Sequence, residues 1–167
     1  MQRLLEDRAA IRHRLRIRFR KDGDLRHISH RDLLRTLERL FRRADLALSM
    51  SEGFHPKPRM SFPSALAVGL VGREEVMELE LAEVLDGEAF LERIRPHSPP
   101  GLTFASAEPI SPGTAKSSLE SVVYEIDVPE TRREEIERAI VRLLSATSHP
   151  IEREGRSAPI DIRPILL

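Results

Sequence analysis

The sequence of 167 residues predicts an α+β fold in which strands and helices alternate in the order β-α-β-β-α-β. Segments 14–20 and 75–83 alternate between apolar and charged residues, which is typical of strands with one buried face. Segment 30–44 instead places leucines at helical spacing with arginines between them. Over residues 14–109 this order predicts a ferredoxin-like split βαβ unit, with two helices on one side of a four-stranded antiparallel sheet.

The first strand carries two different faces. One face is apolar, with Leu15, Ile17 and Phe19. The other face is basic, with Arg14, Arg16, Arg18 and Arg20. Because the first and third strands of a split βαβ sheet are neighbours, we expect Arg16, Arg18 and Arg20 to lie beside Glu78 and Glu80 on the open face. Such cross-strand ion pairs contribute only about 0.2–1 kcal/mol each, yet they would neutralise much of a basic surface.

The first helix begins with a clear capping signal. Ser29 is the expected N-cap, and Asp32 is placed where a carboxylate favours the positive end of the helix. The apolar stripe predicted to face the core consists of Leu33, Leu34, Leu37, Leu40 and Phe41. The arginines predicted to point away from it are Arg31, Arg35, Arg39 and Arg42.

The rest of this unit is predicted from shorter patterns. The stretch 49–58 contains one glycine and two prolines, and we expect it to be an irregular loop. We expect an edge strand over residues 59–67, interrupted by Pro63. A short helix over 87–94 and a weak strand over 102–107 complete the unit.

Outside this unit the sequence predicts three further segments. Residues 1–13 are an N-terminal extension, and residues 110–118, rich in Pro, Gly and Ser, are the expected linker. Residues 119–167 read as a partial second β-α-β unit, with a strand over 121–128, a helix over 129–146 and an extended end over 159–167. Because this is half of a split unit and ends on two leucines, we expect either that its last strand docks on the first sheet or, as we favour, that the unit is truncated.

Composition excludes several classes of function. The chain has no cysteine, so it holds no thiolate-bound iron–sulfur cluster, no thiolate zinc site and no Cys nucleophile. Its histidines lack the spacing of a metal site, and we expect neither metal nor cofactor. With 4% aromatic residues, a wide base-stacking platform is not expected. No apolar run is long enough for a membrane span and the start is too charged for a signal peptide, which favours a cytoplasmic protein.

The formal net charge of zero conceals an asymmetry. Residues 1–60 contain 16 Lys and Arg against eight Asp and Glu, a net charge of +8. The remaining residues contain 11 basic and 19 acidic side chains, a net charge of −8. A basic part beside an acidic part indicates either a surface that binds polyanions or two halves that neutralise each other.

The candidate binding site lies in the basic part. His30 and Arg31 stand in the first helical turn, where unpaired backbone N–H groups favour anions, and Arg35 follows one turn later. The loop adds Gly53, His55, Lys57 and Arg59. We expect these seven residues to form a cup for a phosphate between the helix start and the loop. The alternative is that Ser29 and Asp32 only cap the helix, and that His30 only packs against the neighbouring strand.

Five motifs follow one another along the chain: RIRFRKDGDLR, ISHRDLLR, RLFRRADL, SEGFHPKPRMSF and ALAVGLVGREEVMELEL. With these motifs, about residues 14–128 resemble a bacterial domain of unknown function that is fused to, or encoded beside, radical S-adenosylmethionine proteins. The sequence departs from the pattern at Arg31, where an apolar residue is expected. The resemblance implies that the partner is a radical enzyme with an iron–sulfur cluster. Because this chain has no cysteine, the cluster would be bound by that partner.

Three hypotheses about function follow. The first is an accessory domain, not an enzyme on its own, that binds RNA, such as transfer or ribosomal RNA, for the radical enzyme. The second is a protein-interaction domain whose arginines dock on an acidic partner. The third is an enzyme that uses His30 or His55 as an acid or base.

Overall fold

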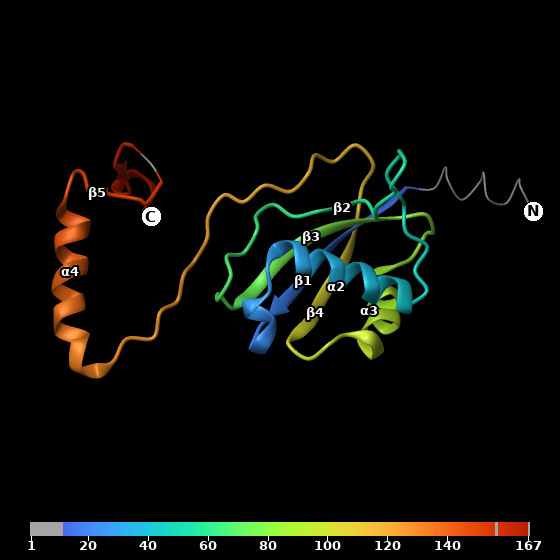
Figure 1. The fold of residues 1–167 in the computed structure, drawn as a ribbon, viewed down its shortest axis with the longest axis horizontal. Coiled ribbons are helices and arrows are strands. Elements are labelled where there is room, and N and C mark those ends of the chain that lie inside the picture. The colour runs from blue at the N-terminus through green and yellow to red at the C-terminus, as the bar shows by residue number, and fades with distance from the viewer. Residues whose placement is uncertain (1–11, 156, 167) are drawn as a thin grey trace, which may run out of the picture. The chain divides into compact units, whose positions relative to one another are not determined.

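The computed structural model describes residues 12–155 and 157–166, so most of the predicted extension over 1–13 lies outside the described residues. The chain has an α+β fold and divides into two compact units, Met1–Ser121 and Val122–Leu167. The elements of the first unit alternate along the chain (Figure 1): β1 (His13–Lys21), α2 (His30–Arg43), β2 (Met60–Ser61), β3 (Gly72–Leu81), α3 (Gly87–Ile94) and β4 (Leu102–Ile110).

The strands of the first unit form one four-stranded sheet in the order β2-β3-β1-β4, with antiparallel neighbours. Arg16 on β1 is paired with Glu78 on β3, and Arg14 with Glu80. The prediction that segments 14–20 and 75–82 are neighbouring strands is therefore confirmed. The expected strand over 59–67 is much shorter, because only Met60 and Ser61 pair with β3. Pro63 has no N–H to donate, which agrees with the early end of this edge strand.

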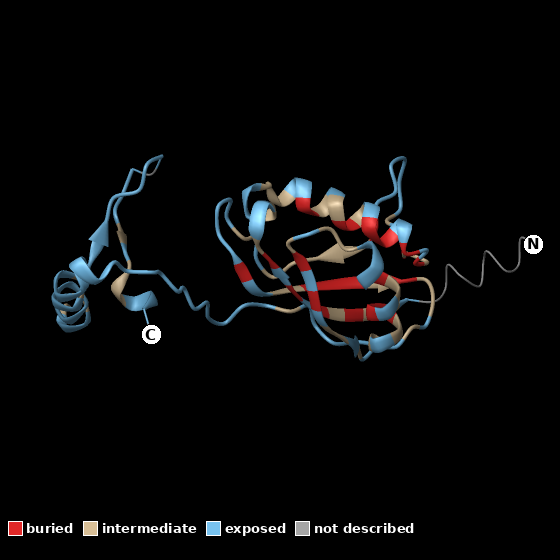
Figure 2. Cartoon of the chain, turned by 90° about the horizontal axis from the view of Figure 1, so that it is seen from below, coloured by how far each residue is buried: buried red, intermediate tan, exposed pale blue. Residues whose placement is uncertain are grey.

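The core lies between the sheet and the two helices α2 and α3. The sheet contributes Leu15, Ile17, Phe19, Met77, Leu79 and Leu81, and α3 contributes Phe90, Leu91 and Ile94. From α2 come the predicted Leu33, Leu37, Leu40 and Phe41, whereas Leu34 is only half-buried. Figure 2 shows the buried residues on the sides of the sheet and helices that face one another. Because both helices share this core, they cover the same face of the sheet.

The other face of the sheet is crossed by residues 111–117, here called the strap. Arg14 on β1 donates a hydrogen bond of 2.7 Å to the backbone oxygen of Thr114. The backbone N and the hydroxyl of Ser117 donate to Glu78 Oε1 at 3.0 and 2.6 Å. The segment that we predicted as a linker is thus fixed to the sheet at two points.

The second unit contains one helix and a small hairpin. The elements are α4 (Arg133–Ser145), β5 (Pro150–Ile151) and β6 (Ile160–Asp161), and the two strands pair antiparallel. The expected helix over 129–146 is confirmed in its main part, with a 3-10 turn at Glu130–Arg132 before α4. The extended end predicted over 159–167 is limited to β6, which a 3-10 turn follows at Arg163–Ile165.

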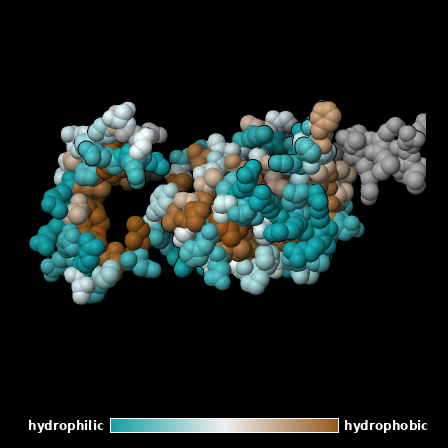
Figure 3. All heavy atoms as spheres, viewed as in Figure 1, coloured by the Kyte–Doolittle hydropathy of each residue, from teal (hydrophilic) through white to brown (hydrophobic). Residues whose placement is uncertain are grey.

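The strand expected over 121–128 is wrong. These residues belong to no ladder, because no described strand lies beside them to accept their backbone hydrogen bonds. In this unit none of the described side chains is buried, and apolar residues gather along α4 (Figure 3). The alternating sequence of 121–128 therefore carries the pattern of a strand without the neighbour that a strand needs.

Candidate functional site

The start of α2 is capped from within the helix. Ser29 Oγ accepts a hydrogen bond from the backbone N of Asp32 at 3.2 Å and donates one to Asp32 Oδ2 at 2.7 Å. Arg35 Nη1 binds Asp32 Oδ1 at 3.1 Å. The hydrogen bond from Ser29, with help from Arg35, lowers the pKa of the Asp32 carboxyl. Ser29 and Asp32 are thus the predicted cap, and the Asp32 carboxylate itself supplies the negative charge that this helix end favours.

His30 lies at the same helix start and packs on an aromatic ring. Its imidazole meets Phe62 edge-on, with ring centroids 5.0 Å apart. The side chain is half-buried, whereas the neighbouring Arg31 is exposed. His30 therefore packs, as in the alternative that we considered, but on Phe62, which follows β2, and not on a strand residue. Arg31 and Arg35 remain as the cations at this end of α2.

The stretch 49–59 contains no helix or strand, as we expected of a loop, but its two arms lie side by side, and it is here called the 49–59 hairpin. Met50 and Pro58 form an antiparallel bridge. Ser51 N donates to Lys57 O at 2.8 Å, and Lys57 N donates to Ser51 Oγ at 3.0 Å. Near its base, Arg59 Nε donates to Met50 O at 3.0 Å. Backbone bonds therefore hold the arms together despite the prolines.

The predicted cup does not form. The 49–59 hairpin begins at the end of β3, where Leu48 bridges Leu81 and Ser49 N donates to Glu80 O. The chain enters α2 at His30 and leaves it fourteen residues later, which at 1.5 Å per residue is about 20 Å away. Figure 1 shows the hairpin at the end of the unit where α2 stops. No hydrogen bond or ion pair among the described residues joins the two groups.

The structure instead presents a row of cations along the outside of α2, here called the arginine face. Its members are all exposed: Arg31, Arg35, Arg39, Arg42 and Arg43. Arg35 pairs with Asp32 at 3.1 Å and Arg42 with Glu38 at 2.7 Å. Within the described part of the chain, the other three have no carboxylate within 4.0 Å. The surface over α2 is accordingly hydrophilic in Figure 3.

The arginines of β1 are neutralised only in part: Arg16 lies beside Glu78 as we expected, whereas Arg20 pairs with Asp22 instead. Arg18 is exposed and has no carboxylate within 4.0 Å among the described residues. Glu78 is 4% exposed and pairs with Arg14 at 2.7 Å and Arg16 at 3.6 Å. Burial raises the pKa of Glu78, but the hydrogen bonds from Ser117 and Arg14 outweigh burial and lower it to about 2. Glu80, the second expected partner, has a buried Oε2 that receives no hydrogen bond from the described residues. With Arg14 and Arg16 paired to Glu78 and the strap across it, this face offers fewer unpaired cations than α2 does.

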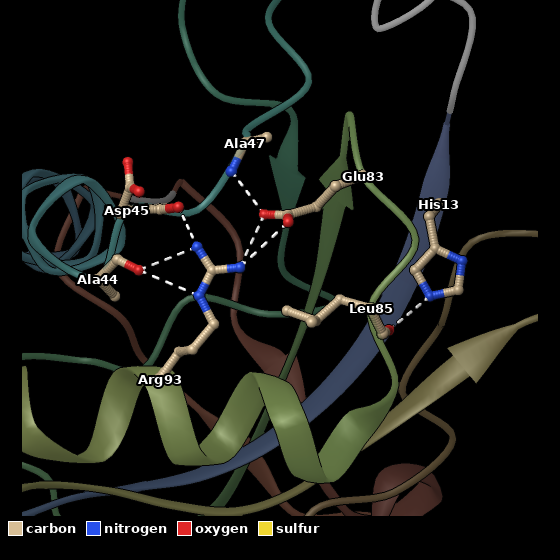
Figure 4. A network of polar contacts seen from close by, with 7 residues as sticks. All are labelled: His13, Ala44, Asp45, Ala47, Glu83, Leu85 and Arg93. Carbon is tan, nitrogen blue, oxygen red and sulfur yellow. Dashed lines mark hydrogen bonds and ion pairs between the residues drawn. The ribbon is translucent and has the colours of Figure 1, made fainter.

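A polar network that sequence reasoning missed fixes the end of α2 (Figure 4). Arg93 on α3 donates to the backbone oxygens of Ala44 and Asp45. It also binds both carboxylate oxygens of Glu83, at 3.2 and 3.1 Å, while Glu83 accepts from Ala47 N at 2.7 Å. Asp45 has a left-handed backbone, with φ of 52°. This network therefore sets the path by which the chain turns from α2 into the 49–59 hairpin.

The sequence analysis also missed two ionisable groups, the buried Lys21 and the half-buried Glu75. Lys21 is 2% exposed on the core side of β1, where burial lowers its pKa despite the nearby Glu75. Burial likewise raises the pKa of the Glu75 carboxyl. In the sequence, the burial of Lys21 was indicated only by its position, since Lys21 continues the alternation of Leu15, Ile17 and Phe19 on the apolar face of the strand.

The fold and charge distribution define an α+β domain with one basic helical face. The chain belongs to a family described as an uncharacterised protein conserved in bacteria (DUF2344), whose model matches residues 14–167. Comparisons with curated proteins and with solved structures find no match. Among the described residues there is no helix that could span a membrane and no cluster of three metal-ligating side chains.

Proposed function

We propose that this domain is a cytoplasmic accessory module that binds RNA through the arginine face of α2. The observation that carries the proposal is the row of five exposed arginines, of which Arg31, Arg39 and Arg43 have no carboxylate partner among the described residues. A guanidinium presents donors in a fixed fork that suits phosphate oxygens. On the sheet's open face, Glu78 pairs with Arg14 and Arg16 and the strap crosses the strands, so the longer row of unpaired cations lies on the helical side.

The topology of the sheet also bears on where RNA would bind. We infer a ferredoxin-like split βαβ unit from the element order β1-α2-β2-β3-α3-β4 combined with the strand order β2-β3-β1-β4. RNA-binding sheets of this kind usually stack bases on aromatic side chains. Here the sheet presents Arg14 and Arg16 paired with Glu78, so we assign RNA contact to the outer helix and not to the sheet.

The partner in this proposal is a radical S-adenosylmethionine enzyme, for which the domain would hold a transfer or ribosomal RNA substrate. The support is the resemblance of residues 14–128 to domains fused to or encoded beside such enzymes, together with the absence of cysteine. An iron–sulfur cluster needs thiolate ligands, so the chemistry would belong to the partner.

Fluorescence anisotropy with labelled transfer RNA and ribosomal RNA fragments, over a series of salt concentrations, tests the proposal. Each phosphate contact on a single strand contributes about −0.7 to the slope of log affinity against log salt. The double variant Arg31→Ala/Arg39→Ala removes two unpaired cations and is expected to weaken binding and flatten this slope by about 1.4.

The matched control is Arg132→Ala/Arg133→Ala, which removes the same charge from residues already paired with Glu135 and Glu137. We expect the control to bind as the unchanged protein does. If the unchanged protein binds no RNA at low salt, the proposal fails, and docking of the arginine face on an acidic protein becomes the better hypothesis. Turnover with a pH profile that is lost on replacing His30 or His55 would instead favour an enzyme.

A further inference from the structure

One aromatic side chain is placed where it serves no purpose in the fold. Phe54 is 102% exposed at the tip of the 49–59 hairpin, whereas four of the other five phenylalanines are buried and Phe62 is half-buried. A lone exposed apolar side chain is ordinary on a protein surface. A large ring at the tip of a projecting hairpin is different, because it is accessible from several sides and is held away from the body of the domain.

The backbone of the hairpin restricts the conformation of the tip that carries Phe54. Gly53, next to Phe54, has φ of 119°, a conformation that other residues rarely adopt. Pro56 and Pro58 restrict the returning arm, and the hydrogen bonds between Ser51 and Lys57 close the hairpin below the tip. A tip that is shaped before its ligand arrives loses less conformational entropy on binding.

The groups around the ring suit a nucleotide. His55 follows Phe54 at the tip and is exposed, and Lys57 stands on the returning arm with no carboxylate within 4.0 Å among the described residues. Arg59 donates a hydrogen bond to Met50 O, and its Nη2 lies 3.7 Å from Glu52 Oε1. The hairpin therefore combines the exposed ring of Phe54 with cations three and five residues further on, Lys57 and Arg59. Base stacking on aromatic rings and neutralisation of phosphates by cations together characterise proteins that bind single strands.

We propose that Phe54 stacks on the base of an unpaired nucleotide whose backbone phosphates Lys57 and Arg59 contact, so that this domain selects single-stranded loops or bulges in RNA. The inference rests on the proposed function and narrows it to a substrate class. In a duplex both faces of each base are covered by its neighbours, so a single ring has nothing on which to stack. The arginine face recognises charge, and the hairpin tip recognises an exposed base.

The test compares a labelled RNA stem-loop with a fully paired duplex of the same length, using Phe54→Ala, Phe54→Leu and Phe54→Trp. Loss of one stacked base costs about 1–3 kcal/mol, which corresponds to about 5- to 150-fold in affinity. We expect the Ala and Leu variants to lose this factor on the stem-loop only, with the salt slope unchanged. We expect Phe54→Trp to retain binding, and 2-aminopurine in the loop to be quenched by the unchanged protein but not by Phe54→Leu.

The control is Val84→Ala, which truncates another apolar side chain that is 75% exposed and is not part of the hairpin. If Phe54→Leu binds the stem-loop as well as Phe54 does, the ring is not stacking and an apolar protein pocket is its better partner. If all Phe54 variants bind normally while Arg31→Ala/Arg39→Ala does not, the stacking inference is wrong and the proposed function stands. If the unchanged protein binds no RNA, both are wrong.

Discussion

Replacing Glu78 tests how strongly the open face of the sheet depends on one carboxylate. Glu78 is buried beneath the strap and receives hydrogen bonds from Arg14 and Ser117. Its pKa of about 2, against an ordinary value of 4.5, means that folding favours the ionised form. At about 1.36 kcal/mol per pH unit, this difference corresponds to about 3 kcal/mol of stability at pH 7.

We therefore expect Glu78→Gln to lower the free energy of unfolding by about 2–3 kcal/mol at pH 7, measured by urea denaturation. Because the folded pKa is depressed, this stabilisation is present above pH 4.5 and is lost as the pH falls toward 2. The difference between the unchanged protein and the variant is thus expected to shrink over that window. The control Glu88→Gln breaks an exposed pair with Arg95 and is expected to cost less than about 1 kcal/mol. A difference that stays constant between pH 7 and pH 2.5 would refute the reasoning.

Three other substitutions test the core, the helix packing and the network at the end of α2. Leu37→Ala removes a fully buried side chain and is expected to cost about 2–5 kcal/mol in thermal denaturation; an unchanged melting temperature would contradict the assigned core. Gly87→Ala would place a methyl carbon 1.8 Å from the backbone oxygen of Ala107, and we expect a loss of about 1–3 kcal/mol, which a normal urea midpoint would exclude. Arg93→Ala removes the side-chain donor to two backbone oxygens and leaves Glu83 with only its bond from Ala47 N, and we expect a cost of about 1–3 kcal/mol, whereas Arg95→Ala, two residues away, is expected to cost less than about 1 kcal/mol.

The elements with strong periodicity were predictable from the sequence. In β1 the alternation of Leu15, Ile17 and Phe19 with arginines predicted one buried apolar face, and these three side chains are buried in the structure. In α2 the cap at Ser29 and the leucine spacing fixed the start and the buried side. Such patterns depend on local conformation and on which side chains are buried. The element and its buried side can therefore be predicted without knowing where other segments lie.

The site was harder to predict because its geometry depends on distance in space. His30 and Lys57 share a basic stretch of sequence, but a helix of fourteen residues separates the turns that hold them. Nothing in the composition of the stretch shows that Phe54 would stand at a hairpin tip, since that placement follows from the bridge between Met50 and Pro58. The prediction of a strand over 121–128 was wrong for a related reason, because alternating residues form a strand only where a neighbouring strand can pair with them.

The strap also has a consequence for local opening of the domain. Its attachment to the sheet passes through Glu78, which accepts from Ser117, and through Arg14, which donates to Thr114. Neither attachment is part of a strand ladder, so the strap can separate from the sheet while the core stays intact. Amide hydrogen exchange at Ser117 would then follow the ionisation of Glu78, becoming faster in acid relative to the amides of β1. The strap is in this sense a subglobal unit of stability that a single carboxylate controls.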